Sequence, residues 1–263
     1  MITIKNEKEI SHIRSTGSRL AEIFEEVSER LAPGITTLEI DSWIEDRLDG
    51  LKLVPCSKGY CGYQHSSCVS INHELVHGVP SSQKRLQLGD LVKIDVCAAC
   101  SLNGWCADMA RSYIVGLLGA VDERTQTDSF ASAVHLAQVA WMSLQRGVEQ
   151  MVPGRRLGDV SNAIQREIES AGYGVVRDFC GHGIGRKMHE EPDVPNFGRR
   201  GQGVLLREGM VFALEPMLTA GGFHITVASD GWTAFTSDKS LAAHVEDTVV
   251  ITKAGPELVT RRR

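Results

Sequence analysis

The sequence predicts a mixed fold of helices and strands built from two similar halves. Two amphipathic helix patterns separated by a Pro-Gly pair occur near the start of the chain, and the same order recurs around a second Pro-Gly pair 120 residues later. Strand-like segments follow each helix pair. Because no linker or low-complexity segment separates the halves, we expect them to share one compact body.

Each element rests on a local pattern. The first helix is predicted over residues 6–31, where apolar side chains recur at helical intervals until Pro33 and Gly34 end the pattern. A second begins at Thr36, which forms a capping-box pattern with Glu39. Two further helices flank the second Pro-Gly pair, over about 130–144 and 160–168. Strands are predicted over 68–72, 91–98, 106–115, 210–215, 223–228 and 243–251.

Composition narrows the function classes. The chain has 263 residues and a formal charge of −5, which argues against a strong overall attraction to nucleic acid or to an anionic membrane. The C-terminal Arg261–Arg263 run is typical of a solvated tail. With no apolar run near the roughly 20 residues of a membrane span and no secretion signal, we expect a cytoplasmic protein with seven reduced cysteines.

The stretch "CGHGIGRKMHEEP", residues 180–192, concentrates several chemically active side chains. Its alternating glycines fit neither a P-loop nor a dinucleotide-binding fingerprint. Cys180 and His182 could form a nucleophile and its base, but no serine elbow or partner acid lies nearby. A metal site is the third interpretation, and it requires carboxylates from elsewhere in the chain.

Four carboxylates interrupt strand-like segments. Asp95 and Asp108 lie on one predicted hairpin, Glu215 ends "MVFALEP", and Glu246 alternates with valines. Each alone is more often a surface or ion-paired residue. Together with the glycine-flanked His182 they indicate a site for borderline divalent ions, and the excess of acids favours two ions about 3.5 to 4 Å apart, as in hydrolases.

The order of these five residues along the chain resembles that of the metal ligands of the methionine aminopeptidase family: Asp95, Asp108, His182, Glu215 and Glu246. The match is closest to the bacterial type I enzymes and spans nearly the whole chain. It is carried by the blocks "YCGYQHSSCVSINHELVHGVP", "GDLVKIDV", "CGHGIGRKMHEEP", "GMVFALEPM" and "DGWTAFTSDKSLAAHVEDTVVIT".

This resemblance implies an α+β pita-bread fold, in which two pseudo-symmetric halves surround a mainly antiparallel sheet. It implies a single catalytic domain over residues 1–263, with halves of roughly 1–118 and 119–263. The implied reaction is removal of the initiator methionine from nascent proteins and peptides when the second residue is small. The implied cofactors are two divalent ions per chain, Co²⁺, Mn²⁺, Fe²⁺ or Zn²⁺, with an additional monovalent cation.

The resemblance also implies residue roles. Asp95 and Asp108 would hold one ion, Asp108 and Glu246 would bridge, and His182 with Glu215 would complete the other. Glu215 would also accept a proton from the water, while His77 and His189 would contact the reacting peptide bond. The methionine pocket would be lined by Tyr60, Tyr63, Cys68, His77, Met188 and Trp232. The implied partners are nascent chains at the ribosome. The resemblance also implies that the protein is a monomer.

The chain departs from the family pattern at several positions. Met188 stands where phenylalanine is usual, Asp247 where a bacterial relative often has histidine, and either Cys56 or Ser57 could face the pocket. Two more residues than usual separate Asp95 from Asp108. An Asn103-Gly104 two-residue turn would leave these aspartates about four residues, or roughly 13 Å, apart. We therefore predict a longer loop or a bulge within 97–106 that brings Asp108 nearly opposite Cys97.

Two other functions stay open at this point. An aminopeptidase P or a prolidase of the same fold would cleave next to proline. A binding protein of this fold that has lost its metals would belong to a different class, although retention of all five ligand positions argues against it.

Overall fold

The structure is a computed structural model that describes residues 2–125 and 130–261. Within these residues the helices are α1 (Glu7–Val27), η1 (Ser28–Arg30), α2 (Thr37–Gly50), η2 (Tyr60–Gly62), α3 (Ala131–Val148) and α4 (Leu157–Ser170). The strands are β1 (Leu53–Pro55), β2 (Cys68–Ile71), β3 (Glu74–Val76), β4 (Leu91–Cys100), β5 (Cys106–Ile114), β6 (Gly174–Val175), β7 (Cys180–Gly183), β8 (Glu190–Pro195), β9 (Val211–Leu214), β10 (Met217–Thr219), β11 (Ile225–Val227), β12 (Ala234–Thr236), β13 (Ala242–His244), β14 (Glu246–Thr252) and β15 (Gly255–Leu258).

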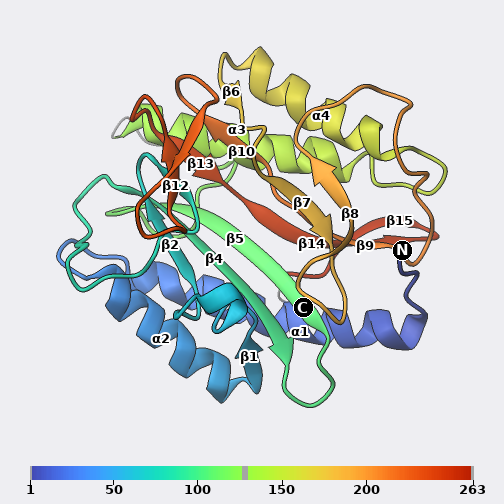
Figure 1. Cartoon of the computed structure of the whole chain (residues 1–263), viewed down its shortest axis with the longest axis horizontal. Coiled ribbons are helices and arrows are strands. Elements are labelled where there is room, and N and C mark those ends of the chain that lie inside the picture. The colour runs from blue at the N-terminus through green and yellow to red at the C-terminus, as the bar shows by residue number, and fades with distance from the viewer. Residues whose placement is uncertain (1, 126–129, 262–263) are drawn as a thin grey trace.

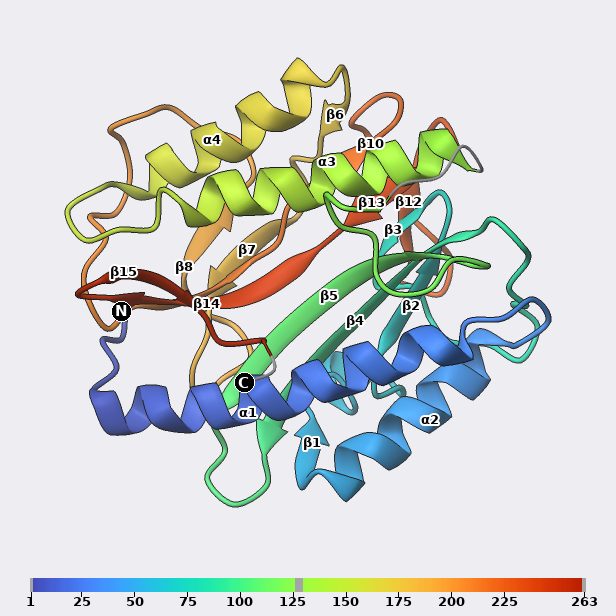
Figure 2. The ribbon, with the colours of Figure 1, turned by 180° about the vertical axis from the view of Figure 1, so that it is seen from behind.

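The strands of the main sheet pair in the order β1-β4-β5-β14-β9-β7-β8, with β2 added beside β4 and β15 beside β14. All of these pairs are antiparallel. In Figure 1, α1 and α2 run along one side of the strands and α3 and α4 along the other. The view from behind shows the helices in front of the strands (Figure 2). The predicted mixture of helices and antiparallel strands is therefore confirmed.

The helix starts follow the predicted chemistry. Thr36 and Glu39 form the expected reciprocal capping box at the start of α2. Asn6 and Glu9 form another at α1, which the sequence pattern had not singled out. These caps satisfy backbone N–H groups that have no partner within the helix, so they fix where each helix begins.

Hydrogen bonds around the two Pro-Gly turns repeat along the chain. Gly34 N–H donates to the Leu86 carbonyl at 2.8 Å, and Gly154 N–H donates to the Leu206 carbonyl at 3.0 Å. Donor and acceptor of the second bond each lie 120 residues after those of the first. Both glycines have positive φ values, 96° and 90°, which explains the residue type at each turn. The recurrence noticed in the sequence thus has a counterpart in backbone contacts.

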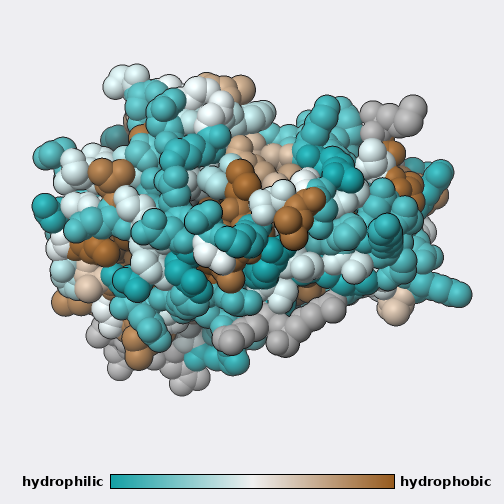
Figure 3. Space-filling view, turned by 90° about the horizontal axis from the view of Figure 1, so that it is seen from below, coloured by the Kyte–Doolittle hydropathy of each residue, from teal (hydrophilic) through white to brown (hydrophobic). Residues whose placement is uncertain are grey.

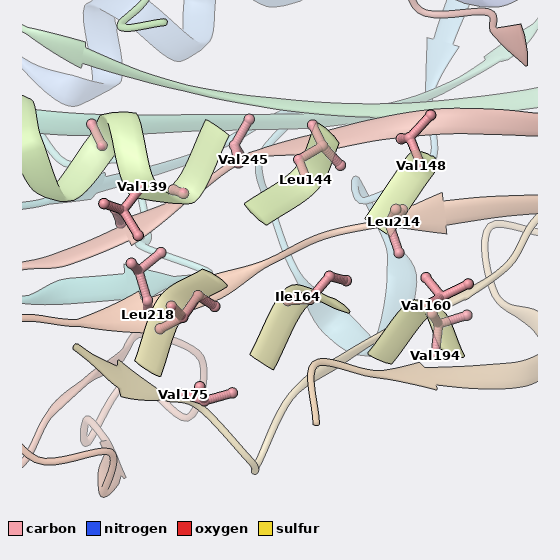
Figure 4. Close-up of a cluster of buried hydrophobic side chains, with 14 of the residues drawn as sticks. Val139, Leu144, Val148, Val160, Ile164, Val175, Val194, Leu214, Leu218 and Val245 are labelled. Atoms are coloured by element: carbon pink, nitrogen blue, oxygen red, sulfur yellow. The ribbon is translucent and has the colours of Figure 1, made fainter. Parts of the chain in front are cut away.

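The two largest apolar clusters of the described residues hold the helices to the strands. One lies between α1, α2 and the β4–β5 hairpin, with Ile44, Val92 and Tyr113 among its buried members. The other joins α3 and α4 to β9, β10 and β14, and Figure 4 shows Leu144, Ile164 and Leu214 within it. Burial of such side chains is worth about 1.5 to 3 kcal/mol each, so each core anchors the strands that meet near the centre of the sheet.

The face seen in Figure 3 is largely hydrophilic, with small separate apolar areas. Across the described residues, exposed large apolar side chains are scattered, with Leu102 and Leu118 the most exposed. Scattered apolar residues are ordinary on protein surfaces. No helix in the described part of the chain has the length and apolar character needed to cross a membrane.

Candidate metal centre

The β4–β5 hairpin brings the first two candidate ligands together. Asp108 pairs with Cys97 and Asp95 with Ala110, in a continuous register from Leu91 to Ala99. The strands are joined by a longer loop, in which Cys100 N–H bonds the Trp105 carbonyl at 3.0 Å. The prediction of a longer loop that places Asp108 opposite Cys97 is confirmed, and its alternative, a bulge, is not needed because the register has no shift.

The other candidate ligands reach the hairpin through neighbouring strands. Glu246 on β14 pairs with Ala110, the same residue that pairs with Asp95. Asp95 and Glu246 therefore lie on the two strands that flank β5, on the same face of the sheet as Ala110. His182 on β7 pairs with Ala213 on β9, and Glu215 follows the end of β9. All five side chains thus converge from four strands and one strand end.

His182 is prepared to bind an ion. Its ring Nδ1 lies 2.9 Å from the Gly183 carbonyl, so Nδ1 carries the hydrogen and Nε2 is left with a free lone pair. That Nε2 lies 3.8 Å from Asp108 Oδ2 and 3.6 Å from Glu215 Oε1. These separations exceed a hydrogen bond but suit two donors on one ion.

The carboxylates lack compensating charge. Burial is the first cause that raises their pKa values, to about 8 for Asp95 and about 7 for Asp108, and well above the usual range for Glu215 and Glu246. The negative charge of Asp108 adds to the rise at Asp95, and that of Glu215 to the rise at Asp108. Among the described residues no Lys or Arg side chain forms an ion pair with these four acids.

These residues fit a divalent metal centre. Asp108, His182 and Glu246 place ligand atoms within 4.8 Å of one another, and so do Glu215, His244 and Glu246. Glu246 Oε1 is buried without a hydrogen-bond partner in the described chain. Divalent cations would neutralise the acids and occupy their free lone pairs, which is the usual way that such a cluster of buried charge is stabilised.

A cavity of about 120 Å³ opens beside these groups. The five candidate ligands form its polar end. Its other walls contain every predicted pocket residue: Tyr60, Tyr63, Cys68, His77, Met188 and Trp232. Drug-sized ligands need pockets of about 300 Å³ or more, so this cavity suits a single apolar side chain. Ser57 lines it, whereas Cys56 turns away and places its Sγ 3.7 Å from Cys106 Sγ.

The two predicted catalytic histidines lie at the rim between this cavity and a neighbouring hollow. His77 and His189 line both spaces, as do His182 and Glu215. Burial lowers the pKa of His77 to about 4, and burial also lowers the pKa of His189. Both imidazoles are therefore neutral at pH 7. The second hollow, about 480 Å³, gives room for more of a ligand than one side chain.

Several expectations about nearby residues need correction or completion. Arg261 is not a solvated tail residue, because its Nη2 lies 3.0 Å from Asp247 Oδ2 and its guanidinium covers Trp141. Arg262 and Arg263 lie outside the described residues. Glu190 lines the second hollow but not the 120 Å³ cavity, and its carboxylate lies 2.9 Å from Lys5 Nζ. All seven cysteines are free.

Two important residues were not identified from the sequence. Arg111 donates from Nη1 to the Glu246 carbonyl at 2.6 Å and from Nη2 to Asp247 Oδ1 at 2.6 Å, which fixes β14 behind the cluster. His244 is fully buried beside Glu215 and Glu246. Its position two residues before Glu246 in a strand-like segment was the available signal, since alternate residues of a strand share a face.

Comparisons with known proteins agree with this geometry. The model of metallopeptidase family M24 matches residues 11–253. The chain belongs to this family. It is 43% identical over 260 residues to the methionine aminopeptidase of Clostridium acetobutylicum, with 99% of each chain covered. It is 38% identical to methionine aminopeptidase 1 of Bacillus subtilis, with 99% of this chain and all of that protein covered.

Solved structures of a methionine aminopeptidase and a prolidase show the same architecture. A methionine aminopeptidase from Thermotoga maritima superposes with a TM-score of 0.92 at 40% identity, with both chains fully covered. A prolidase from Pyrococcus furiosus, at 23% identity and a TM-score of 0.75, shares the fold over 66% of its length. These likenesses confirm the pita-bread fold that the family resemblance implied.

Proposed function

We propose that this M24 metallopeptidase is a methionine aminopeptidase, which removes the N-terminal methionine from nascent proteins and peptides when the second residue is small. One observation carries the proposal: the five candidate ligands line the same cavity of about 120 Å³ as a set of mainly aromatic and sulfur-containing side chains. A thioether side chain packs favourably against such walls. The full-length similarity to methionine aminopeptidases supports the same conclusion.

The metal content is part of this proposal. Asp95 with Asp108 would hold one divalent ion, His182 with Glu215 the other, and Asp108 with Glu246 would bridge them. Co²⁺, Mn²⁺, Fe²⁺ and Zn²⁺ all accept this donor set of carboxylates and imidazole, and a monovalent cation is a further expectation. When bound, the divalent ions would lower the pKa of a water and polarise the carbonyl of the first peptide bond.

The protein's own side chains would perform the remaining tasks. Tyr63 and Trp232, with ring centroids 5.0 Å apart, would hold the methionine side chain in the cavity. His189 bonds Tyr60 through Nδ1 at 3.2 Å, which leaves Nε2 for the substrate carbonyl. Neutral His77 would face the scissile amide from the opposite rim. Glu215, whose pKa burial raises, would accept a proton from the water and pass it to the leaving amine.

We also propose that residues 1–263 form one catalytic unit of two related halves, roughly 1–118 and 119–263, because the cluster draws ligands from both. The repeated Pro-Gly hydrogen bonds support this division. The proposal also includes that the protein is a monomer and that it acts in the cytoplasm on nascent chains at the ribosome. Its polypeptide substrate would continue from the cavity into the neighbouring hollow.

The test compares two peptides. The full chain, stripped of metal by EDTA and reloaded with Co²⁺ or Mn²⁺, should release methionine from Met-Ala-Ser and no glycine from Gly-Pro-Ala. The same protein kept in EDTA provides the control. Glycine release would indicate an X-Pro aminopeptidase, and absence of metal-dependent methionine release would defeat the proposal.

A further inference from the structure

His244 is a buried histidine that the proposed mechanism does not use. It ends β13 two residues before Glu246, and its side chain is 1% exposed. Val245 between them packs into the apolar core under α3 (Figure 4). Because neighbouring residues of extended chain point to opposite sides, His244 and Glu246 both face the carboxylate cluster.

The Glu215 carboxylate lies between two imidazoles. His182 Nε2 is 3.6 Å from Oε1, and His244 Nε2 is 3.6 Å from Oε2. The two rings differ in their surroundings. His182 lines the cavity and has its Nδ1 hydrogen bonded to a carbonyl, whereas His244 is not among the residues that line the cavity. His244 therefore contacts the carboxylate from behind.

Both ring nitrogens of His244 lack a hydrogen-bond partner within the described chain. A buried polar group left in this state costs free energy, and such groups are rare in native proteins unless they have a function. His244 Nε2 has two carboxylate neighbours. Glu215 Oε2 is the nearer, at 3.6 Å, and Glu246 Oε2 is 4.0 Å away. A small rotation of the Glu215 side chain would close the remaining gap to a hydrogen bond of about 2.9 Å.

We propose that His244 is a positioning residue, whose Nε2–H donates to Glu215 Oε2 and holds Oε1 toward His182 and the cavity. The inference rests on the proposed metal-dependent function, because it concerns how a candidate ligand is oriented. Removing a hydrogen bond to a ligating carboxylate typically lowers metal affinity or activity by about 10- to 100-fold. A neutral imidazole supplies this donor without adding another charge to the cluster.

Two substitutions separate the hydrogen bond from simple packing. His244→Leu keeps an apolar side chain of moderate size but removes the donor. His244→Gln retains an amide N–H that reaches about as far as Nε2. His224→Leu is the matched control, because that histidine is exposed and lies outside the cluster. Each full-length protein is stripped with EDTA, titrated calorimetrically with Mn²⁺ or Co²⁺, and assayed on Met-Ala-Ser.

We expect His244→Leu to weaken the affinity for one ion by about 10- to 100-fold and to lower kcat more than it changes KM. The visible spectrum of the Co²⁺-loaded protein should change as well. His244→Gln should stay within a few-fold of the unsubstituted protein. Unchanged affinity and Co²⁺ spectrum in His244→Leu would overturn the proposal, and so would equal impairment in both His244 variants.

The wild-type protein offers a test that does not depend on the folding of a variant. In ¹⁵N NMR of the Zn²⁺-loaded chain, the His244 ring should carry its hydrogen on Nε2. An Nε2 without hydrogen would indicate direct coordination and would contradict the proposed donor role. If wild-type protein released no methionine, the proposed function would fail, yet the metal titrations and the ring tautomer would still decide the role of His244.

Discussion

The two proposed halves of the molecule contribute to the cluster of candidate ligands in different ways. Residues 1–118 supply Asp95 and Asp108 from one long hairpin with nine paired positions. Residues 119–263 supply His182, Glu215 and Glu246 from three short segments, and the β7–β8 pairing shifts register next to His182. The first half offers a preset pair of carboxylates, whereas the second must hold each side chain by separate supports.

This difference shows where supporting contacts are needed. The hairpin positions its aspartates through its own register. In the second half, Glu246 depends on Arg111 and Asp247, His182 on the Gly183 carbonyl, and Glu215 on its buried neighbours. We therefore expect the site to be most sensitive to changes that remove a support from the second half.

The largest effect on stability is expected from Asp247→Ala. Asp247 accepts hydrogen bonds from Arg111 and Thr260 at 2.6 Å and from Arg261 at 3.0 Å, and its side chain is fully buried. Its loss leaves the buried Arg111 charge uncompensated, which typically costs about 3 to 5 kcal/mol. Urea unfolding of the metal-free chain measures this change in the free energy of unfolding, and Asp46→Ala, at an exposed position, is the control. A loss below about 1 kcal/mol would contradict the supporting role of Asp247.

A smaller free-energy change but a severe loss of activity is expected from Asp108→Asn. Asp108 joins the halves, because its backbone N–H donates to Thr248 Oγ1 at 2.8 Å and its carboxylate meets those of the second half. Loss of this ligand should lower kcat/KM on Met-Ala-Ser by about 100-fold or more. The metal-free protein should become more stable, since one buried negative charge is gone. Asp46→Asn is the matched control, and retention of a tenth of the activity would remove Asp108 from the ligand set.

The acids also predict a pH dependence for the metal-free protein. Their raised pKa values, from 3.8 to about 8 for Asp95 and about 7 for Asp108, mean that the folded state keeps protons that the unfolded state releases. Their contribution to stability is fully present below about pH 4 and is lost as the pH rises toward 8. The melting temperature in EDTA should fall over this range relative to that of Asp108→Asn. Bound Mn²⁺ should reduce this fall in melting temperature. If the melting temperatures of the two proteins changed equally with pH, the raised pKa of Asp108 would not be the cause.

The pocket, to which both halves contribute, predicts an effect on specificity. Met188 comes from the second half and lines the cavity together with Tyr60, Tyr63 and Cys68 of the first. A flexible methionine adapts to ligands of different shape, whereas phenylalanine is rigid. Met188→Phe should therefore lower kcat/KM for Leu-Ala-Ser relative to Met-Ala-Ser by about three- to ten-fold. Val227→Phe, at an exposed position away from the cavity, is the control. An unchanged ratio would show that Met188 does not set selectivity.

The contrast between the halves also explains what could be predicted from sequence. The capping box of α2 depends on a local pattern and the placement of Asp108 opposite Cys97 on counting residues across one loop, and the structure confirms both. Glu215 follows the end of β9 and Glu246 begins β14, so the sequence could suggest each as a ligand but could not place the two together. Arg111, Asp247 and Arg261 meet across 136 and 14 residues of sequence, and no local pattern encodes such pairing.

His244 was missed for a different reason. Its i, i+2 spacing to Glu246 was visible within the predicted strand 243–251, but nothing in the sequence indicates that His244 lies beside Glu215. What makes it notable is burial without a hydrogen-bond partner, and that depends on side chains brought from β9 and β10. A residue whose role is to hold another is therefore recognised only in the folded structure.

The smallest effect is expected in the hairpin loop of the first half. Gly104 has a φ of 67°, and a Cβ added there would meet only an Arg186 nitrogen at 3.5 Å, so Gly104→Ala adds backbone strain with little crowding. We expect a loss of about 1 kcal/mol in unfolding free energy with kcat within two-fold of wild type, because nine registered pairs hold Asp108 in place. Gly172→Ala, at a φ of 82° in an open turn of the second half, is the matched control for strain alone. A large fall in kcat for Gly104→Ala but not for Gly172→Ala would mean that the loop, rather than the strand register, positions the aspartates.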